Sequence, residues 1–264
     1  MINVIFRSYL RQTPVVGISY LAGCGGRGKA AVIDPMLEDI PKYMEDAKLA
    51  GMEIKYVIDT HIHADHISGA RKLIELTNAA YVLHESVQAG FPFYAVTEGD
   101  IIELGNTFMM VLHTPGHTPE HISLVVSDHS RADQPWFVLT GHTLMVGDVG
   151  RTELAVDGAE GARQLFHSVF DKLLSLPEHL EVFPGAFSGS VCGRSLSGKP
   201  SSTIGFEKRY NRSLQMKTEE EFVQFMLHDV PKSPMLFNEI RAFNMGHIQD
   251  APSISLEGWA DPNA

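Results

Sequence analysis

Apolar residues along this chain gather in short runs that are separated by polar or glycine-rich turns. Short runs bounded by such turns are typical of β-strands, whereas apolar positions three and four residues apart are typical of helices. The predicted strands cover residues 3–6, 17–21, 30–33, 55–60, 80–83, 100–104, 107–112, 122–126, 136–139 and 180–183. The predicted helices cover residues 39–49, 70–76, 161–174, 203–210 and 219–227.

The order of these elements does not fit a single doubly wound sheet. We therefore predict an α/β protein with an αββα sandwich, in which two mixed β-sheets pack face to face and helices flank their outer faces. Residues 1–248 are expected to form one domain, with 203–248 as its C-terminal helical extension and 249–264 as a loosely held tail. The glycine-rich stretch 23–29 invites a phosphate-loop interpretation, but a strand follows it instead of a helix. A hairpin turn is the better prediction there.

Three histidines and one carboxylate lie close together directly after the predicted strand 55–60. They are His61, His63, Asp65 and His66. Imidazole and carboxylate groups are the usual ligands of zinc, iron and manganese, and so many in one short loop predict a metal site rather than surface histidines.

Four predicted strands end alike, in a small or polar turn followed by a position suited to a ligand. These positions are His61, His117, His142 and Ala186. In sheets flanked by helices, sites form beyond the carboxyl ends of strands, so the four positions are expected to converge. The fourth carries no ligand.

Composition narrows the classes of partner. The 264 residues include 21 basic and 32 acidic side chains, for a net charge of −11. This balance argues against nucleic acid or an anionic membrane as partner and favours a small-molecule substrate. Two cysteines far apart give no disulfide framework, and neither a signal sequence nor a long apolar run is evident. We expect a cytoplasmic protein, and a homodimer remains open.

Three motifs resemble the metallo-β-lactamase superfamily: HxHxDH at 61–66, Thr-Pro-Gly-His at 114–117 and Thr-Gly-x at 140–142. Within it the chain most resembles the glyoxalase II-like branch that includes the persulfide (sulfur) dioxygenases. Further stretches carry this narrower resemblance, at 31–35, 60–69, 147–153, 202–207 and 243–246. The resemblance covers most of residues 2–246.

The chain departs from the family pattern at two positions. Family members typically carry Asp at the position of His142, where a carboxylate bridges two metals, and His at the position of Ala186. An imidazole does not normally bridge, and without the second histidine the Asp65/His66 side has few ligands. The resemblance thus implies one metal, Fe(II) with Zn(II) as the alternative. Its ligands would be His61, His117 and His142. His63, Asp65 and His66, which ligate in dinuclear relatives, would orient water or the ligands.

Arg151 resembles a family arginine near the substrate pocket, where a guanidinium could bind a carboxylate of a glutathione-like substrate. A structural role in its own loop explains it equally well. Asp65 and Arg151 are the candidate catalytic residues. Cys192 and Lys199 could border the pocket, although a single cysteine there is more often inert. Asp148 is a weaker candidate for a replacement ligand, and His84 is a lone histidine at a strand end.

Three functions remain open. The first is a persulfide dioxygenase that oxidises a glutathione-persulfide-like substrate with O2 to sulfite at a mononuclear iron. The second is a hydrolase of the glyoxalase II or lactonase type, acting on a thioester or ester. The third is a degenerate relative without catalysis. The fold alone does not choose among the three, because one fold hosts many functions.

Overall fold

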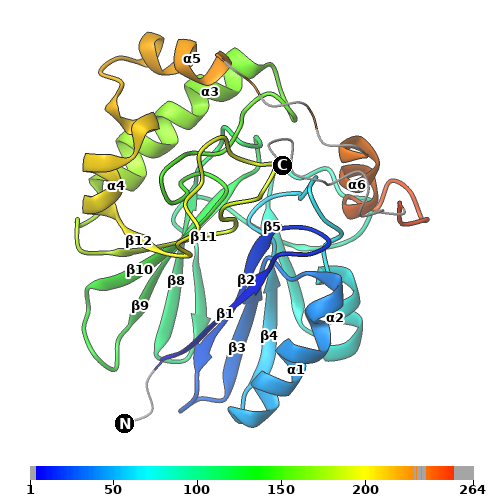
Figure 1. Cartoon of the computed structure of the whole chain (residues 1–264). Helices are drawn as coiled ribbons and strands as arrows, with labels where there is room; N and C mark the ends of the chain where they lie inside the picture. The colour runs from blue at the N-terminus through cyan, green and yellow to red at the C-terminus, as the bar shows by residue number, and fades with distance from the viewer. Residues whose placement is uncertain (1–3, 229, 231–232, 234–235, 253–264) are drawn as a thin grey trace.

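Two mixed six-stranded sheets form the centre of the computed structural model, which describes residues 4–228, 230, 233 and 236–252 (Figure 1). The first sheet has the order β1-β2-β3-β4-β5-β6 and the second β12-β11-β10-β9-β8-β7. The first contains β1 (Val4–Arg11), β2 (Gly17–Cys24), β3 (Lys29–Ile33), β4 (Glu53–Ile58), β5 (Ala80–His84) and β6 (Tyr94–Val96). The second contains β7 (Ile101–Leu104), β8 (Thr107–His113), β9 (Ile122–Asp128), β10 (Pro135–Gly141), β11 (Glu181–Pro184) and β12 (Ser202–Thr203).

Helices cover the outer faces of both sheets, which confirms the predicted αββα sandwich. Against the first sheet pack α1 (Ile40–Leu49) and α2 (Ala70–Thr77), whose apolar residues join those of β3 and β4 in one cluster. Against the second pack α3 (Gly158–His167), α4 (Ile204–Tyr210) and α5 (Glu219–Leu227). A last helix, α6 (Phe237–Asn244), lies near the end of β5 in Figure 1.

The main core lies between the two sheets. Strands of both sheets contribute to it with alternate residues, such as Ile18 and Tyr20 from β2 and Leu124 and Val126 from β9. Such alternation is what a sheet with two different faces requires. Strands β2 and β9 are buried along nearly their whole length because helices cover their other faces.

Backbone hydrogen bonds join the two sheets at the end where the candidate ligands lie. The Ile18 amide donates to the Gly185 carbonyl at 2.7 Å, and the Ile122 amide donates to the Thr60 carbonyl at 2.8 Å. The buried Tyr20 hydroxyl adds a bond of 2.6 Å to the Pro184 carbonyl. These contacts fix the strand ends of one sheet relative to those of the other, which any site built from both sheets needs.

Most predicted elements are confirmed within a few residues, including the hairpin turn between the antiparallel β2 and β3. The helix predicted over 161–174 begins earlier, because Asp157 caps the amides of Ala159 and Glu160. It ends as an α-helix at His167 and continues as a π turn and a 3-10 turn. Strands β6 and β12 and helix α6 were not predicted from the sequence. The two strands are too short to show a clear period, and α6 begins after Leu236 without a side-chain cap. The predicted tail lies from residue 253 onward outside the described residues.

The intersheet core gives a first test of this fold. Leu124 is fully buried between the sheets, whereas Leu49 at the end of α1 is 75% exposed. We expect Leu124→Ala to lower the free energy of unfolding by about 3 kcal/mol through lost burial and a residual cavity. The control Leu49→Ala should change it by less than about 0.5 kcal/mol. Denaturant unfolding measures both, and equal effects would contradict the two-sheet packing.

Candidate metal centre

The loop after β4 is shaped by a buried aspartate. Asp34 follows β3 and takes a positive φ of 50°, which turns its side chain toward the loop. Its carboxylate accepts hydrogen bonds from the Thr60 amide at 2.6 Å and from the Thr60 hydroxyl at 3.0 Å, and it contacts His63 Nε2 at 3.2 Å. One carboxylate on the neighbouring strand therefore sets the course of the chain that carries His61 and His63.

The structure brings His61, His117 and His142 together. One ring nitrogen of each lies within 4.8 Å of the others, and all three side chains are buried. His117 Nε2 and His142 Nδ1 are 3.3 Å apart. Two nitrogens bound to one ion in a tetrahedron, each about 2.0–2.1 Å from it, would be about 3.3–3.4 Å apart. The spacing of these imidazoles thus fits a shared metal ion.

Hydrogen bonds determine which nitrogen faces the centre. His117 Nδ1 donates to the Arg151 carbonyl at 2.7 Å, which leaves Nε2 with its lone pair. The Thr60 hydroxyl donates to Asp34, so its oxygen accepts from His61 Nδ1 at 3.0 Å. His61 Nε2 is then buried without a hydrogen-bond partner among the described residues. Such an arrangement is typical of metal-binding histidines, whose other nitrogen is held by the protein.

Burial keeps these histidines neutral. It lowers the pKa of His117 to about 3 and that of His61 well below the ordinary value, helped by the neighbouring histidines. Burial likewise lowers the pKa of His142, although the charge of Asp65 opposes this. A neutral imidazole is the form that binds metal, so all three offer a lone pair at neutral pH.

His63, Asp65 and His66 form a second group whose ligand atoms also lie within 4.8 Å of one another. Asp65 Oδ2 and His66 Nε2 are buried without a hydrogen-bond partner in the described part of the chain. His63 differs from the first three histidines. Burial favours its neutral form, but the hydrogen bond and charge of Asp34, with Asp65 and Asp59, raise its pKa well above the ordinary value. The three neighbouring carboxylates therefore distinguish His63 from the three neutral histidines.

A backbone hydrogen bond and the close-packed Gly141 fix the position of His142. Its amide donates to His121 Nε2 at 3.0 Å. Gly141 has a φ of +49°, and a Cβ there would lie 2.5 Å from His121 Nε2 and 2.6 Å from the Thr60 hydroxyl. A side chain at this position would therefore collide with two groups that orient the candidate ligands.

His121 was not among the predicted site residues. Its Nδ1 contacts the Thr114 and Thr143 hydroxyls, each at 3.0 Å, and its Nε2 accepts from the His142 amide. Both nitrogens are used, so His121 positions the site and has no lone pair left for a metal. Its ring stacks on His61 with centroids 5.0 Å apart.

Ala186 and Cys192 occupy the side of the site next to Asp65. Ala186 is buried after β11 and offers no ligand atom, as the sequence analysis expected. The Cys192 sulfur lies within 4.8 Å of ligand atoms of Asp65 and His142. Burial and the nearby Asp65 charge raise the pKa of Cys192 well above the ordinary value. Cys192 therefore borders the pocket, as the sequence analysis had considered.

Arg151 lies beside the site and is almost wholly buried. Its Nε contacts Glu153 Oε1 at 2.6 Å, and its Nη1 donates to the Val191 carbonyl at 3.1 Å. These bonds tie residues 151–153 to the loop before Cys192 and hold the carbonyl that orients His117. They favour the structural alternative for Arg151, while its role as a carboxylate clamp stays a prediction.

The weaker candidates lie elsewhere. Asp148 accepts hydrogen bonds from Ser213 at 2.6 Å and from the Arg194 and Ser195 amides, so its carboxylate holds a loop and is not available as a ligand. His84 stacks on His113 at 4.0 Å, outside the two groups. Lys199 is exposed.

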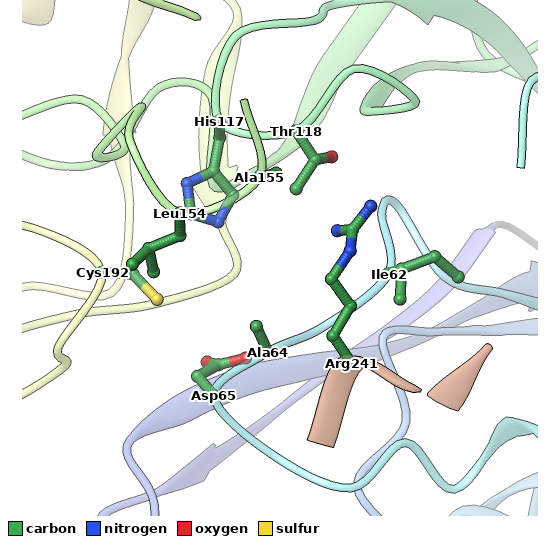
Figure 2. A pocket seen from close by; sticks show the side chains of 9 residues that line it. All are labelled: Ile62, Ala64, Asp65, His117, Thr118, Leu154, Ala155, Cys192 and Arg241. Carbon is green, nitrogen blue, oxygen red and sulfur yellow. The ribbon is translucent and has the colours of Figure 1, made fainter. Parts of the chain in front are cut away.

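A pocket opens beside the candidate ligands (Figure 2). It is lined by Ile62, Ala64, Asp65, His117, Thr118, Leu154, Ala155, Cys192 and Arg241. Figure 2 shows Arg241 reaching from α6 toward Ile62 and Thr118. The same helix ends in Asn244, whose side-chain amide donates to the carbonyls of His63 at 2.9 Å and His66 at 2.8 Å. The sequence analysis missed both contacts because it did not predict α6.

Comparison with known proteins decides the family. A family model described as the metallo-beta-lactamase superfamily matches residues 13–185. The chain belongs to the metallo-β-lactamase superfamily. Its motifs had indicated this family, and the arrangement of the two sheets agrees with it. The chain is an enzyme of this fold.

The relatives include both kinds of enzyme that the motifs resemble. "Persulfide dioxygenase ETHE1, mitochondrial" of Bos taurus is 30% identical over 236 residues, which cover 89% of this chain and 86% of that protein. A hydroxyacylglutathione hydrolase of Polaromonas sp. is 32% identical over 170 residues, which cover 63% of this chain and 60% of that protein. The crystal structure of ETHE1 from Myxococcus xanthus matches with a TM-score of 0.79 and 30% identity, covering 92% of this chain and 99% of that chain.

The family and the clustered histidines support the binding of a divalent metal. No helix in the described ranges has the length and apolarity that a membrane crossing would require.

The link between α6 and the ligand loop gives a second test. Asn244 also accepts from the Ser68 amide at 3.0 Å, so Asn244→Ala would leave three buried or half-buried backbone groups without their partner. At about 1 kcal/mol each, we expect the free energy of unfolding to fall by about 2–4 kcal/mol. Bound metal should also fall, because the loop that Asn244 holds at residues 63 and 66 also carries His61.

The matched control is Asn238→Ala in the first turn of the same helix. Asn238 forms no side-chain hydrogen bond with the described residues. Thermal unfolding and metal analysis of the two variants measure the difference. Equal metal content in both would contradict the role assigned to Asn244.

Proposed function

We propose that this protein is a persulfide dioxygenase that converts a small persulfide, R–SSH, with O2 and water into the thiol R–SH and sulfite. We further propose that His61, His117 and His142 hold one iron ion as Fe(II); Zn(II), which has no redox chemistry, is the alternative metal only for a hydrolase. The persulfide dioxygenase relatives, which align over most of their length, support this choice.

The observation that carries the proposal is the set of neutral imidazoles that share one centre. Three nitrogens within 4.8 Å are enough to hold one ion and leave further positions open for substrate. All three donors are uncharged, so the full charge of a divalent ion remains. Such a centre favours an anionic sulfur ligand, which a persulfide provides.

The side chains around the metal centre would have separate roles in the reaction. When bound, a ferrous ion supplies the electron-transfer and O2 chemistry that protein side chains lack. His117 is held in one tautomer by the Arg151 carbonyl. Burial alone would raise the pKa of Asp65, but the neighbouring histidines and the hydrogen bond with His66 lower it well below the ordinary value, so Asp65 stays ionised. Its bare oxygen could orient the water that contributes the third oxygen of sulfite.

The pocket walls suit a reactive sulfur species. Ile62, Ala64, Leu154 and Ala155 give the pocket a largely apolar lining. An apolar lining limits the access of bulk water and so protects a persulfide from side reactions.

A hydrolase of the glyoxalase II type is the second candidate. It is favoured by the bare ligand atoms of Asp65 and His66, which could bind a second metal, and by the hydroxyacylglutathione hydrolase relative. A metal there would lower the pKa of bound water to about 7 and polarise a thioester carbonyl. Against it stands Ala186, which offers no ligand atom for a second metal.

Metal content and oxygen uptake separate the two candidates. In protein purified without added metal we expect about one iron per chain and O2 uptake with glutathione persulfide, but no hydrolysis of S-lactoylglutathione. His117→Ala should lose most of the metal and at least about 100-fold of the activity, since a ligand is worth several kcal/mol. The control is His179→Ala, which alters an exposed histidine.

Elemental analysis and an oxygen electrode measure these outcomes. Two zinc ions per chain, with thioester hydrolysis and no oxygen uptake, would establish the hydrolase instead. Full activity in His117→Ala would contradict the ligand set.

A further inference from the structure

Arg241 is a cation placed at the pocket by α6, the helix that Asn244 ties to the ligand loop. It extends from α6, and its side chain is 22% exposed. It lines the pocket together with Asp65, His117 and Thr118 (Figure 2). Arg241 is the only arginine or lysine among the nine lining residues.

Glu120 orients the Arg241 guanidinium but contacts only one of its nitrogens. Its Nη1 contacts Glu120 Oε1 at 3.4 Å, and the same oxygen accepts from the Ile62 amide at 3.1 Å. The Glu120 side chain is 5% exposed, so it provides a fixed anchor on one side of the arginine. Within the described ranges, Nε and Nη2 form no hydrogen bond or ion pair. These two donors stay available for a ligand.

The base of the side chain is also fixed. Asn244, three positions along the same helix, binds the His63 and His66 carbonyls, so α6 is tied directly to the loop that carries the candidate ligands. The distance between Arg241 and the metal centre is thereby held by the fold. A residue held at a fixed distance from the metal centre favours substrates in which the charged group and the sulfur are separated by that distance.

Charge favours an anion at this position. The chain carries a net charge of −11, so the positive charge of Arg241 beside the pocket is a local exception in an acidic protein. An arginine offers paired N–H groups in the planar arrangement that matches a carboxylate, and such pairs give specificity as well as affinity.

We propose that Arg241 binds a carboxylate of the substrate and thereby selects persulfides of carboxylate-bearing thiols, such as a peptide thiol, over neutral ones. This inference rests on the proposed function for the identity of the reacting sulfur. It assigns Arg241 to binding and not to the chemical step. It also moves the substrate-carboxylate role from Arg151, which is buried against Glu153, to a residue that lines the pocket.

The test compares two substrates that differ only in charge. They are glutathione persulfide and the persulfide of glutathione diethyl ester, whose two carboxylates are blocked. For the unmodified enzyme we expect kcat/KM to be about 10- to 100-fold higher for the acid, as befits one charge-assisted contact. Arg241→Gln should raise KM for glutathione persulfide about 10- to 100-fold and leave kcat within about 2-fold. KM for the diester persulfide should not change.

Two further variants isolate the effect. Arg241→Lys keeps the charge but loses the planar pair of donors. Its KM for glutathione persulfide should therefore lie between those of the unmodified enzyme and Arg241→Gln. Arg209→Gln removes an arginine that pairs with Glu178 at 2.8 Å on the exposed surface of α4, and it should behave as the unmodified enzyme. If Arg241→Gln does not fold, the acid-to-diester ratio of the unmodified enzyme still decides, because no preference for the acid overturns the proposal.

Binding without turnover separates this inference from the proposed function. Calorimetry with unreactive S-methylglutathione should show affinity that falls about 10-fold or more in Arg241→Gln. If that loss occurs while no persulfide is oxidised, the dioxygenase proposal fails and the role of Arg241 stands. If persulfide is oxidised but neither KM nor S-methylglutathione affinity depends on Arg241, the residue is only a partner of Glu120 and the inference is overturned.

Discussion

Buried nitrogens and oxygens without hydrogen-bond partners are the constraint on which this site depends. His61 Nε2, His63 Nδ1, His66 Nε2 and Asp65 Oδ2 are all of this kind among the described residues. Leaving a polar group unpaired in a protein interior costs about 1–3 kcal/mol, so several together would be a large penalty in a chain with no use for them. A metal ion held by His61 would remove that penalty at its Nε2, and the water proposed at Asp65 would lower it in the second group.

The surrounding structure serves to hold these lone pairs in place. Asp34 fixes the loop of His61, the Arg151 carbonyl fixes the tautomer of His117, and His121 fixes the backbone of His142. Each comes from a different part of the chain, and the hydrogen bonds between the two sheets keep those parts in register. The site is therefore a property of the whole sandwich, and weakening the intersheet core should affect it from a distance.

Much of this arrangement could be predicted from the sequence. Strand ends mark the edge of a sheet where ligands gather, so the positions of His61, His117 and His142 after predicted strands were enough to group them. Arg241, Cys192 and Asn244 could not be placed in this way. Arg241 and Asn244 lie on a short helix whose Leu236 start carries no side-chain cap, and Cys192 lies in a loop without periodicity. Their positions depend on tertiary contacts, which local patterns do not encode.

The central claim is that one metal ion is shared by His61, His117 and His142. A crystal of the purified enzyme, measured at and below the iron absorption edge, tests it most directly, because the anomalous signal locates iron without reference to activity. The account predicts one iron peak within about 2.0–2.3 Å of a nitrogen of each of these histidines. A peak bound only by His63, Asp65 and His66, or two metal peaks of comparable height, would contradict it.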